Sequence, residues 1–196
     1  MSIKIRFKRV LCAALMLVVL GSSTGCAAFR TFPKFSKALE KEKKGKSVEG
    51  RIGDELGTFF FRFSAEEARL APEYEGFVPE DGEQLLIVKM KLKNTYRESI
   101  TMFDTDFQIT WDDISEDAFA LPLSYNRAGG ALSAEELPTE YELGVDEEKE
   151  GLLIFAVPED REDFALSYLE RFQEDENSTR DGDLFIVYFT AQGEDA

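Results

Sequence analysis

The chain has 196 residues, a formal charge of −16 and no histidine. Without histidine, Ser-His-Asp and Cys-His catalysis and histidine metal sites are excluded. Residues 52–196 carry 36 acidic and 11 basic side chains, whereas residues 26–51 carry three acidic and eight basic ones. A domain this acidic repels nucleic acid and bare anionic membrane, although such charge also simply favours solubility.

The first 25 residues have the three parts of a secretory signal. Lys4, Arg6, Lys8 and Arg9 precede an unbroken apolar run, Val10–Leu20, and small residues follow it. The run has eleven residues, and a membrane-spanning helix needs about 20. We therefore expect residues 1–25 to be a signal peptide that is removed from the mature protein.

The end of this signal, Ser23-Thr24-Gly25-Cys26, resembles the lipobox of bacterial lipoproteins. It departs from the usual pattern at Ser23, where an aliphatic residue is commoner. The resemblance implies that Cys26 becomes the first mature residue and carries diacylglycerol, often with a further acyl chain such as palmitate, and two chains suffice for durable anchoring. The alternative is an ordinary secretory signal that leaves Cys26 as a free thiol. Cys12 leaves with the signal, so the mature chain has no disulfide.

Residues 26–51 are expected to form a basic tether between the lipid and the domain. Four apolar side chains fall on one face of a helix in this segment, namely Phe29, Phe32, Phe35 and Leu39. Two interpretations remain open: a flexible spacer, or a helix that lies in the membrane interface. The glycine-marked stretch Gly45–Gly53 places the start of the acidic domain at residue 52.

Seven strands are predicted in the domain, at Gly57–Ser64, Gln84–Asn94, Ile100–Trp111, Ala118–Tyr125, Leu152–Val157, Asp163–Phe172 and Leu184–Thr190. Leu152–Val157 is apolar on both sides and should be a central strand that Pro158 ends. Asp163–Phe172 also fits a helix, but its neighbours favour a strand. Glu73–Gly82 is expected to be a loop, and the capping-box spacing of Ser133 and Glu136 predicts a helical turn.

Alternation assigns faces to these strands. The residues predicted to point inward are Phe59, Phe61, Phe63, Leu86, Val88, Met90, Leu92, Phe103, Phe107, Ile109 and Trp111. Those predicted to point outward are Lys89, Lys91, Lys93, Asp104, Asp106 and Gln108. The lysines should form a solvated face that pairs with neighbouring acids, across to the aspartates if the two strands are adjacent. A partner-binding ladder is the alternative.

Short strands with turn signals between them, and no βαβ rhythm, predict an all-β antiparallel sandwich. Two stretches, Pro79–Asn94 and Glu150–Pro158, resemble the opening and closing of domain-of-unknown-function family 4352, and the aromatic strand near Phe107 fits its middle. The usual Pro-Gly turn before the closing strand is replaced by Asp146-Glu147-Glu148. The resemblance implies an immunoglobulin-like sandwich of the kind common in Gram-positive lipoproteins, and no catalytic residues.

Residues 175–183 are rich in side-chain oxygens and are expected to form a loop. Counted from Asn177, Thr179 and Asp181 fall at ligand positions three and five of a calcium loop. Tyr188 stands where the final glutamate is needed, so a solvated acidic turn is the favoured interpretation. The weak calcium candidates are Asn177, Thr179, Asp181 and Asp183. Asp112, Asp113, Glu116 and Asp117 form a second acidic loop.

Together these features favour a lipid-anchored binding module on the extracytoplasmic face of the cell membrane. Its partner would be an envelope protein, a cell-wall polymer or a host surface. The alternative is a structural or accessory subunit of a membrane complex, and a carboxylate hydrolase is the weakest hypothesis. We expect no enzyme activity, no cofactor beyond the lipid on Cys26 and no nucleic-acid partner. The pattern indicates neither the ligand nor the oligomeric state.

Overall fold

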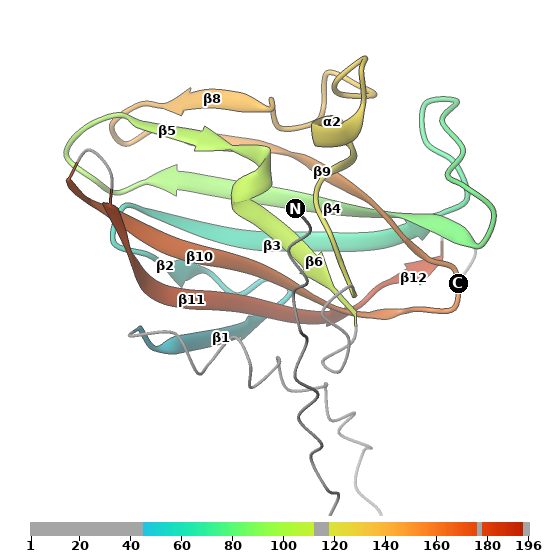
Figure 1. The fold of residues 1–196 in the computed structure, drawn as a ribbon, viewed down its shortest axis with the longest axis horizontal. Coiled ribbons are helices and arrows are strands. Elements are labelled where there is room, and N and C mark those ends of the chain that lie inside the picture. The colour runs from blue at the N-terminus through green and yellow to red at the C-terminus, as the bar shows by residue number, and fades with distance from the viewer. Residues whose placement is uncertain (1–44, 112–117, 176–177, 194–196) are drawn as a thin grey trace, which may run out of the picture. The chain divides into compact units, whose positions relative to one another are not determined.

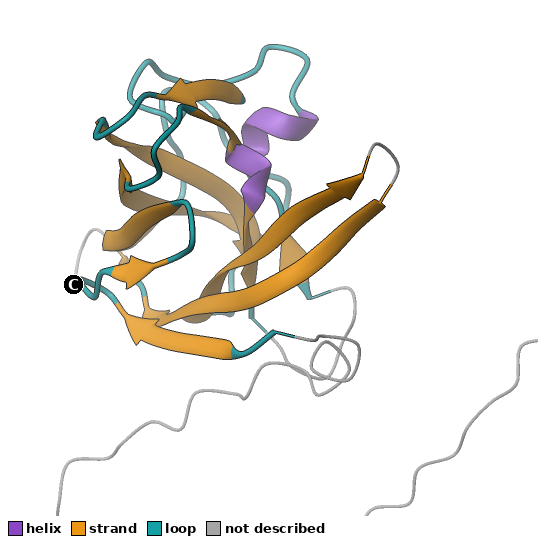
Figure 2. Cartoon of the chain, turned by 90° about the vertical axis from the view of Figure 1, so that its left-hand side faces the viewer, coloured by secondary structure: helices purple, strands orange, loops and turns teal. Residues whose placement is uncertain are grey.

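A computed structural model describes residues 45–111, 118–175 and 178–193 of the chain. Most of this part is β-strand and very little of it is helix, as Figures 1 and 2 show. The strands are β1 (Ser47–Arg51), β2 (Leu56–Gly57), β3 (Phe61–Ala71), β4 (Glu83–Asn94), β5 (Ile100–Phe103), β6 (Phe107–Thr110), β7 (Phe119–Ala120), β8 (Glu140–Leu143), β9 (Glu148–Pro158), β10 (Asp163–Asp175), β11 (Ser178–Thr190) and β12 (Gln192–Gly193). Two adjacent helical turns are η1 (Asp104–Asp106) and α2 (Leu123–Asn126). Within these described ranges, no helix has the length and apolar character needed to cross a membrane.

The strands form two sheets and a short ribbon. The first sheet has the order β1-β11-β10-β6-β7, the second has the order β12-β3-β4-β9 with β2 beside β3, and the ribbon is β5-β8. We call the two larger sheets sheet A and sheet B. Strands β3, β4 and β9 oppose β6, β10 and β11, which reproduces the A-B-E and C-F-G arrangement of immunoglobulin domains. The predicted immunoglobulin-like β-sandwich is confirmed. Most pairs are antiparallel, but β1 runs parallel to β11 and β12 runs parallel to β3.

A phenylalanine-rich core lies between the sheets. Phe61 and Phe63 come from sheet B, Phe107 and Tyr168 come from sheet A, and their rings are 4.9–6.5 Å apart. All four side chains are buried. Aromatic pairs at this spacing add to the burial of apolar area, so the core stabilises the domain without a disulfide.

The alternation predicted for Gln84–Asn94 is confirmed in β4. Leu86, Val88, Met90 and Leu92 are buried in the core, and the lysines between them point outward. The neighbours of β4 are β3 and β9, however, and not the strand that carries Asp104 and Asp106. The conditional lysine–aspartate pairing therefore does not form. The strand β9 is not central as predicted, because it is the last strand of sheet B. Among the described residues, its other side carries only a bridge from Glu136 to Leu152.

The single strand predicted at Ile100–Trp111 is wrong. The helical turn η1 interrupts it, so that β5 pairs with β8 in the ribbon while β6 joins β10 in sheet A. The turn shifts the alternation: Phe103 is exposed, and Asp104 is completely buried. The side chain of Asp106 accepts a hydrogen bond from the backbone N–H of Phe103, at 2.9 Å, which stabilises the turn.

Two other predicted elements differ in part. Ala118–Tyr125 contains only the short strand β7 before Pro122 and α2. The predicted helical turn after Ser133 is an irregular turn, in which Glu136 accepts hydrogen bonds from the backbone N–H groups of Leu132 and Ser133. The loop predicted at Glu73–Gly82 is confirmed, and so is the strand reading of Asp163–Phe172, which lies inside β10.

Sheet A includes residues of the predicted tether. Ser47–Arg51 is the strand β1, which extends sheet A beside β11. Its residues are mostly polar, so no apolar period marks them as a strand, and the pairing with β11 decides their conformation. The segment between Cys26 and the domain is correspondingly shorter.

Candidate functional site

Aromatic side chains gather at the end of the sandwich where β3 begins. Phe59 and Phe60 come from the β2–β3 turn, Tyr96 from the β4–β5 loop and Phe172 from β10. The ring of Phe59 lies 5.0 Å from Phe60, 5.7 Å from Tyr96 and 5.6 Å from Phe172, between ring centres. Three segments that are distant in sequence thus form one continuous aromatic surface.

A tight turn places Phe59 on the outside. The backbone N–H of Thr58 bonds to the carbonyl oxygen of Phe61 at 2.8 Å, and the hydroxyl of Thr58 accepts from Phe60 and Phe61. The buried carboxylate of Glu170 accepts a hydrogen bond from the N–H of Phe59, at 2.6 Å. As a result Phe59 is 60% exposed although it lies between ordered neighbours. The prediction that Phe59 shares the inward face of Phe61 and Phe63 is wrong because the strand begins only at Phe61.

Two arginines lie over the rings of this cluster. The guanidinium carbon of Arg180 is 4.7 Å from the centre of the Phe172 ring, and that of Arg97 is 5.8 Å from the centre of Tyr96. Both distances are within the range of a cation–π interaction. We call Phe59, Phe60, Tyr96, Phe172, Arg97 and Arg180 the aromatic–arginine surface. Aromatic residues and arginine are the types most enriched at the centres of protein interfaces.

Sequence patterns did not identify this surface. Tyr96 and Arg97 follow the last alternating position of β4, and Arg180 was assigned to an acidic loop. One signal was available: three consecutive phenylalanines, Phe59, Phe60 and Phe61, cannot all point inward from an alternating strand. At least one of them has to be exposed or to lie in a turn.

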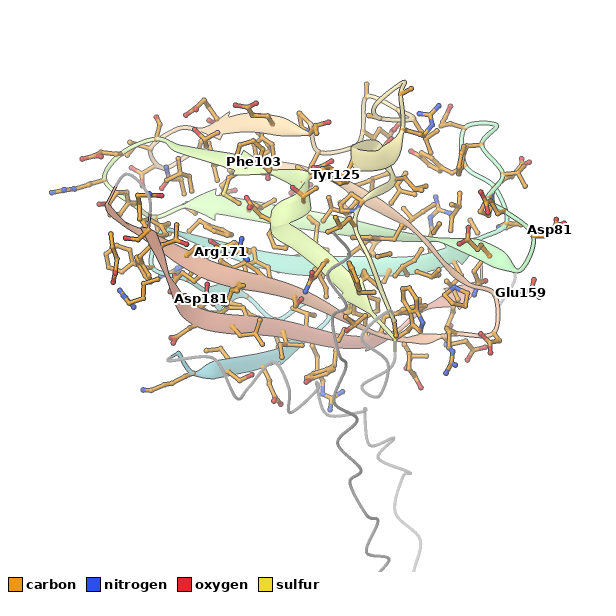
Figure 3. All side chains as sticks on the ribbon, viewed as in Figure 1. Asp81, Phe103, Tyr125, Glu159, Arg171 and Asp181 are labelled. Carbon is orange, nitrogen blue, oxygen red and sulfur yellow. The ribbon has the colours of Figure 1, made fainter. Side chains whose placement is uncertain are left out.

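The calcium candidates do not form a loop. Thr179, Asp181 and Asp183 lie on strand β11, where alternate residues are roughly 7 Å apart, and Asn177 lies outside the described residues. Asp181 pairs with Arg171 at 3.6 Å, at the end of the hairpin where Figure 3 labels both. Asp183 accepts a hydrogen bond from the N–H of Lys46 at 2.8 Å. The predicted loop is wrong because pairing with β10 extends the strand.

Two other predicted sites lie outside the described residues: the second acidic loop at 112–117, and Cys26 with the whole signal. In the part of the chain that is described, no three histidine, cysteine or acidic side chains are grouped as they would be to hold a metal ion. Calcium binding stays a sequence prediction.

The lysines on the outer face of β4 pair with glutamates of the neighbouring strand β9. Lys93 and Lys91 approach Glu148 at 2.9 and 3.5 Å, and Lys89 approaches Glu150 at 3.8 Å. The hydrogen bond and the charge of Glu148 raise the pKa of Lys93, and the same pair lowers the pKa of Glu148. The predicted solvated, paired face is confirmed, with glutamates of β9 as the partners.

The helical turn η1 carries two carboxylates, Asp104 and Asp106. Burial raises the pKa of Asp104 and of Asp106, and burial together with these two carboxylates raises the pKa of the Tyr141 hydroxyl. One oxygen of Asp104 accepts a hydrogen bond from Ser124, and the other has no partner among the described residues. Asp104 is completely buried, whereas Asp106 is half-buried.

No protein-family model matches the chain, and no curated protein matches it. A solved structure of the candidate lipoprotein ycdA from Bacillus subtilis is similar at 16% identity and a TM-score of 0.49, over 70% of this chain and 38% of ycdA. The yjhA protein from Bacillus subtilis has 14% identity and a TM-score of 0.41, over 61% and 79% of the two chains. An uncharacterized β-sandwich protein from Clostridium difficile 630 has 13% identity and a TM-score of 0.40, over 76% and 97%. All three TM-scores are below 0.5, so neither fold nor function is inferred from them.

Proposed function

We propose that this protein is a lipid-anchored, extracytoplasmic interaction module whose aromatic–arginine surface binds a protein partner in the cell envelope. The observation that supports it most is the exposed side chain of Phe59 within an ordered cluster of aromatic rings and arginines. Such a surface is pre-organised, because the rings and guanidinium groups already support one another before a partner arrives.

The proposed location depends on the first 26 residues. A basic end, an apolar run and a small-residue site before Cys26 are the signals of an exported lipoprotein. The resemblance to family 4352 implies the same setting. The lipid on Cys26 would hold the acidic domain near a membrane that its own charge repels.

A protein partner fits the surface better than a polyanion or a lipid surface does. Each arginine of the surface also lies close to an acid: Arg180 pairs with Glu174 at 3.2 Å and Arg97 with Glu98 at 3.4 Å. The cluster is therefore apolar and close to neutral, not a concentrated positive charge. Neutral aromatic anchors with charged groups at the rim are typical of protein interfaces.

A photo-reactive residue at Tyr96, followed by mass spectrometry of adducts from living cells, tests this function. We expect one dominant protein adduct. Phe59→Ser should reduce its yield by about tenfold, since a central aromatic contact contributes about 1.4 kcal/mol or more.

Val78→Ser is the matched control, because Val78 is 64% exposed and lies in the loop at the opposite end of β3 and β4. It should leave the yield unchanged, whereas Cys26→Ala should reduce the yield by releasing the protein from the membrane. A yield that Val78→Ser reduces as strongly as Phe59→Ser, or the absence of any protein adduct, would contradict the proposal. A stoichiometric adduct within a membrane complex would favour the accessory-subunit alternative.

A further inference from the structure

Sheet A carries an apolar strip on its outer face. Three successive cross-strand pairs of β10 and β11 form it: Leu169 with Leu184, Ser167 with Ile186, and Ala165 with Tyr188. Their sequence neighbours, such as Leu166, Tyr168 and Val187, belong to the core between the sheets. Since side chains alternate along a strand, the six residues of the strip point away from that core.

The strip is buried although it faces outward. Ile186 is 1% exposed and Ser167 is 2% exposed, and Ala165 and Leu184 are also buried. Among the described residues, the apolar neighbours of this cluster are Leu169 and Tyr188, which belong to the same two strands. The buried hydroxyl of Ser167, in the middle of the strip, has no hydrogen-bond partner among the described residues. A buried outer face of this kind needs a covering segment.

The tether joins the domain at one end of the strip. Lys46 bonds to Asp183, and Gly45 lies so close to Gly182 that a Cβ on Gly45 would be 1.8 Å from the Gly182 carbonyl oxygen. β1 then runs beside β11, with Ser47 level with Leu184. Gly45, at which the segment 27–44 joins the domain, therefore lies close to the first pair of the strip.

This segment also matches the strip in composition and length. It carries four large apolar residues at helical spacing, Phe29, Phe32, Phe35 and Leu39. As a helix they would span roughly 15 Å, and the strip from Leu169 to Ala165 spans about 13 Å. The segment has six basic and two acidic side chains, whereas residues 52–196 have 36 acidic and 11 basic ones. Apart from residues 1–26, which contain the predicted signal, the other stretches outside the described ranges are 112–117, 176–177 and 194–196, and they contain one large apolar residue, Ile114.

We propose that residues 32–44 pack on the strip, with Phe32 and Phe35 against Ile186 and Leu184. The segment is then part of the domain and not a spacer. Only the consequence for the membrane rests on the proposed lipid anchor: a folded-back segment holds the domain, and with it the neighbouring aromatic–arginine surface, close to Cys26. The same apolar side chains cannot contact the strip and the membrane interface at once.

A photo-reactive residue at Leu169 in the full chain tests this arrangement. After digestion, we expect an intrachain adduct that joins the β10 peptide to a peptide within residues 27–44. A photo-reactive residue at Lys91, on the outer face of sheet B, should give no such adduct.

Substitutions in the segment itself supply the decisive comparison, because they leave the packing between the two sheets intact. Phe32→Ser with Phe35→Ser should reduce the adduct at least about tenfold, which corresponds to about 1.4 kcal/mol. Lys34→Ser with Lys37→Ser changes the same segment but spares its apolar side, and should reduce the adduct much less. Cys26→Ala should leave the intrachain adduct in place, so loss of membrane attachment and loss of packing are separate results. Adducts of Leu169 only with lipid, or only with other proteins, would overturn the proposal.

Discussion

The outer faces of the two sheets differ in what packs on them. Each face bears a small apolar cluster that is separate from the core between the sheets. In sheet B this cluster is Ala71, Leu85, Ile87 and Ile154, and it is packed against Tyr74, Phe77, Leu123 and Leu132 from two loops of the domain. In sheet A the apolar neighbours described are residues of the same strands.

The two apolar clusters therefore differ in which part of the chain packs over them. The loops over sheet B lie between strands of the domain, one between β3 and β4 and the other between β7 and β8. The proposed cover of sheet A lies before the first strand, β1.

The largest expected effect is a loss of stability on both faces. Ile87 in sheet B and Ile186 in sheet A are 3% and 1% exposed. We expect Ile87→Ala and Ile186→Ala each to reduce the free energy of unfolding by about 2–5 kcal/mol, because both remove buried methyl groups. Urea denaturation of the full chain measures this. A loss below about 1 kcal/mol for Ile186→Ala would mean that the strip faces solvent.

The second prediction separates the two covers with a double-mutant cycle. In the Phe32→Ser and Phe35→Ser background, Ile186→Ala should cost about 1 kcal/mol less than in the parent chain, because its packing partners are already lost. Ile87→Ala should cost the same in both backgrounds, within about 0.5 kcal/mol. If the Phe32→Ser and Phe35→Ser background changed the cost of Ile87→Ala and of Ile186→Ala equally, the segment would not pack specifically on sheet A.

The third prediction concerns the pH dependence of the sheet B cover. Ser124 of α2 is hydrogen-bonded to Asp104, and Leu123 beside it packs on the sheet B cluster. Burial raises the pKa of Asp104, so its contribution to stability is full below about pH 4, the ordinary pKa, and is lost as the pH rises through the folded-state pKa. Asp104→Asn should therefore flatten the decline of unfolding free energy above about pH 4.

Thermal unfolding over a pH series measures that slope, and Asp81→Asn, at an exposed position, is the control. A slope that Asp104→Asn leaves unchanged would show that Asp104 does not titrate differently in the folded and unfolded states.

The smallest effect should come from salt. The Debye length falls from about 10 Å at 0.1 M to about 3 Å at 1 M, which weakens the attraction between the basic segment and the acidic domain. Amide exchange of residues 29–39 should accelerate about two- to threefold over this range, while exchange of residues 123–132 stays the same. An equal response of both segments would exclude charge as a difference between the covers.

Sequence patterns predicted well what depends on local alternation. Gln84–Asn94 forms β4 with the predicted faces because one side meets the core and the other meets water. The prediction of one strand at Ile100–Trp111 is wrong because the turn η1 interrupts it and shifts the alternation of side chains. One aspartate side chain stabilises that turn by a local hydrogen bond. The strands at Ser47–Arg51 and Ser178–Asp183 were not predicted for another reason. Both segments are polar, and they become strands only by pairing with other segments of the chain.

The candidate surface could be predicted only in its chemistry, not in its position. The run of three phenylalanines required an exposed ring, but nothing in the local pattern brings Tyr96, Phe172 and Arg180 to Phe59. These side chains come together only because the fold brings three separate segments of the chain to one end of the sandwich. The strip on sheet A is similar, since it becomes visible only when the register of β10 against β11 is known.

The most direct measurement is amide hydrogen exchange of residues 29–39 in the full chain carrying Cys26→Ala, without membrane or detergent. If this segment covers the strip of sheet A, its amides should exchange at least about tenfold more slowly than those of an unstructured peptide, as expected for a segment docked by about 1.4 kcal/mol or more. Phe32→Ser with Phe35→Ser should abolish that protection. Exchange at the rate of an unstructured chain before any substitution would show that the segment does not cover the strip.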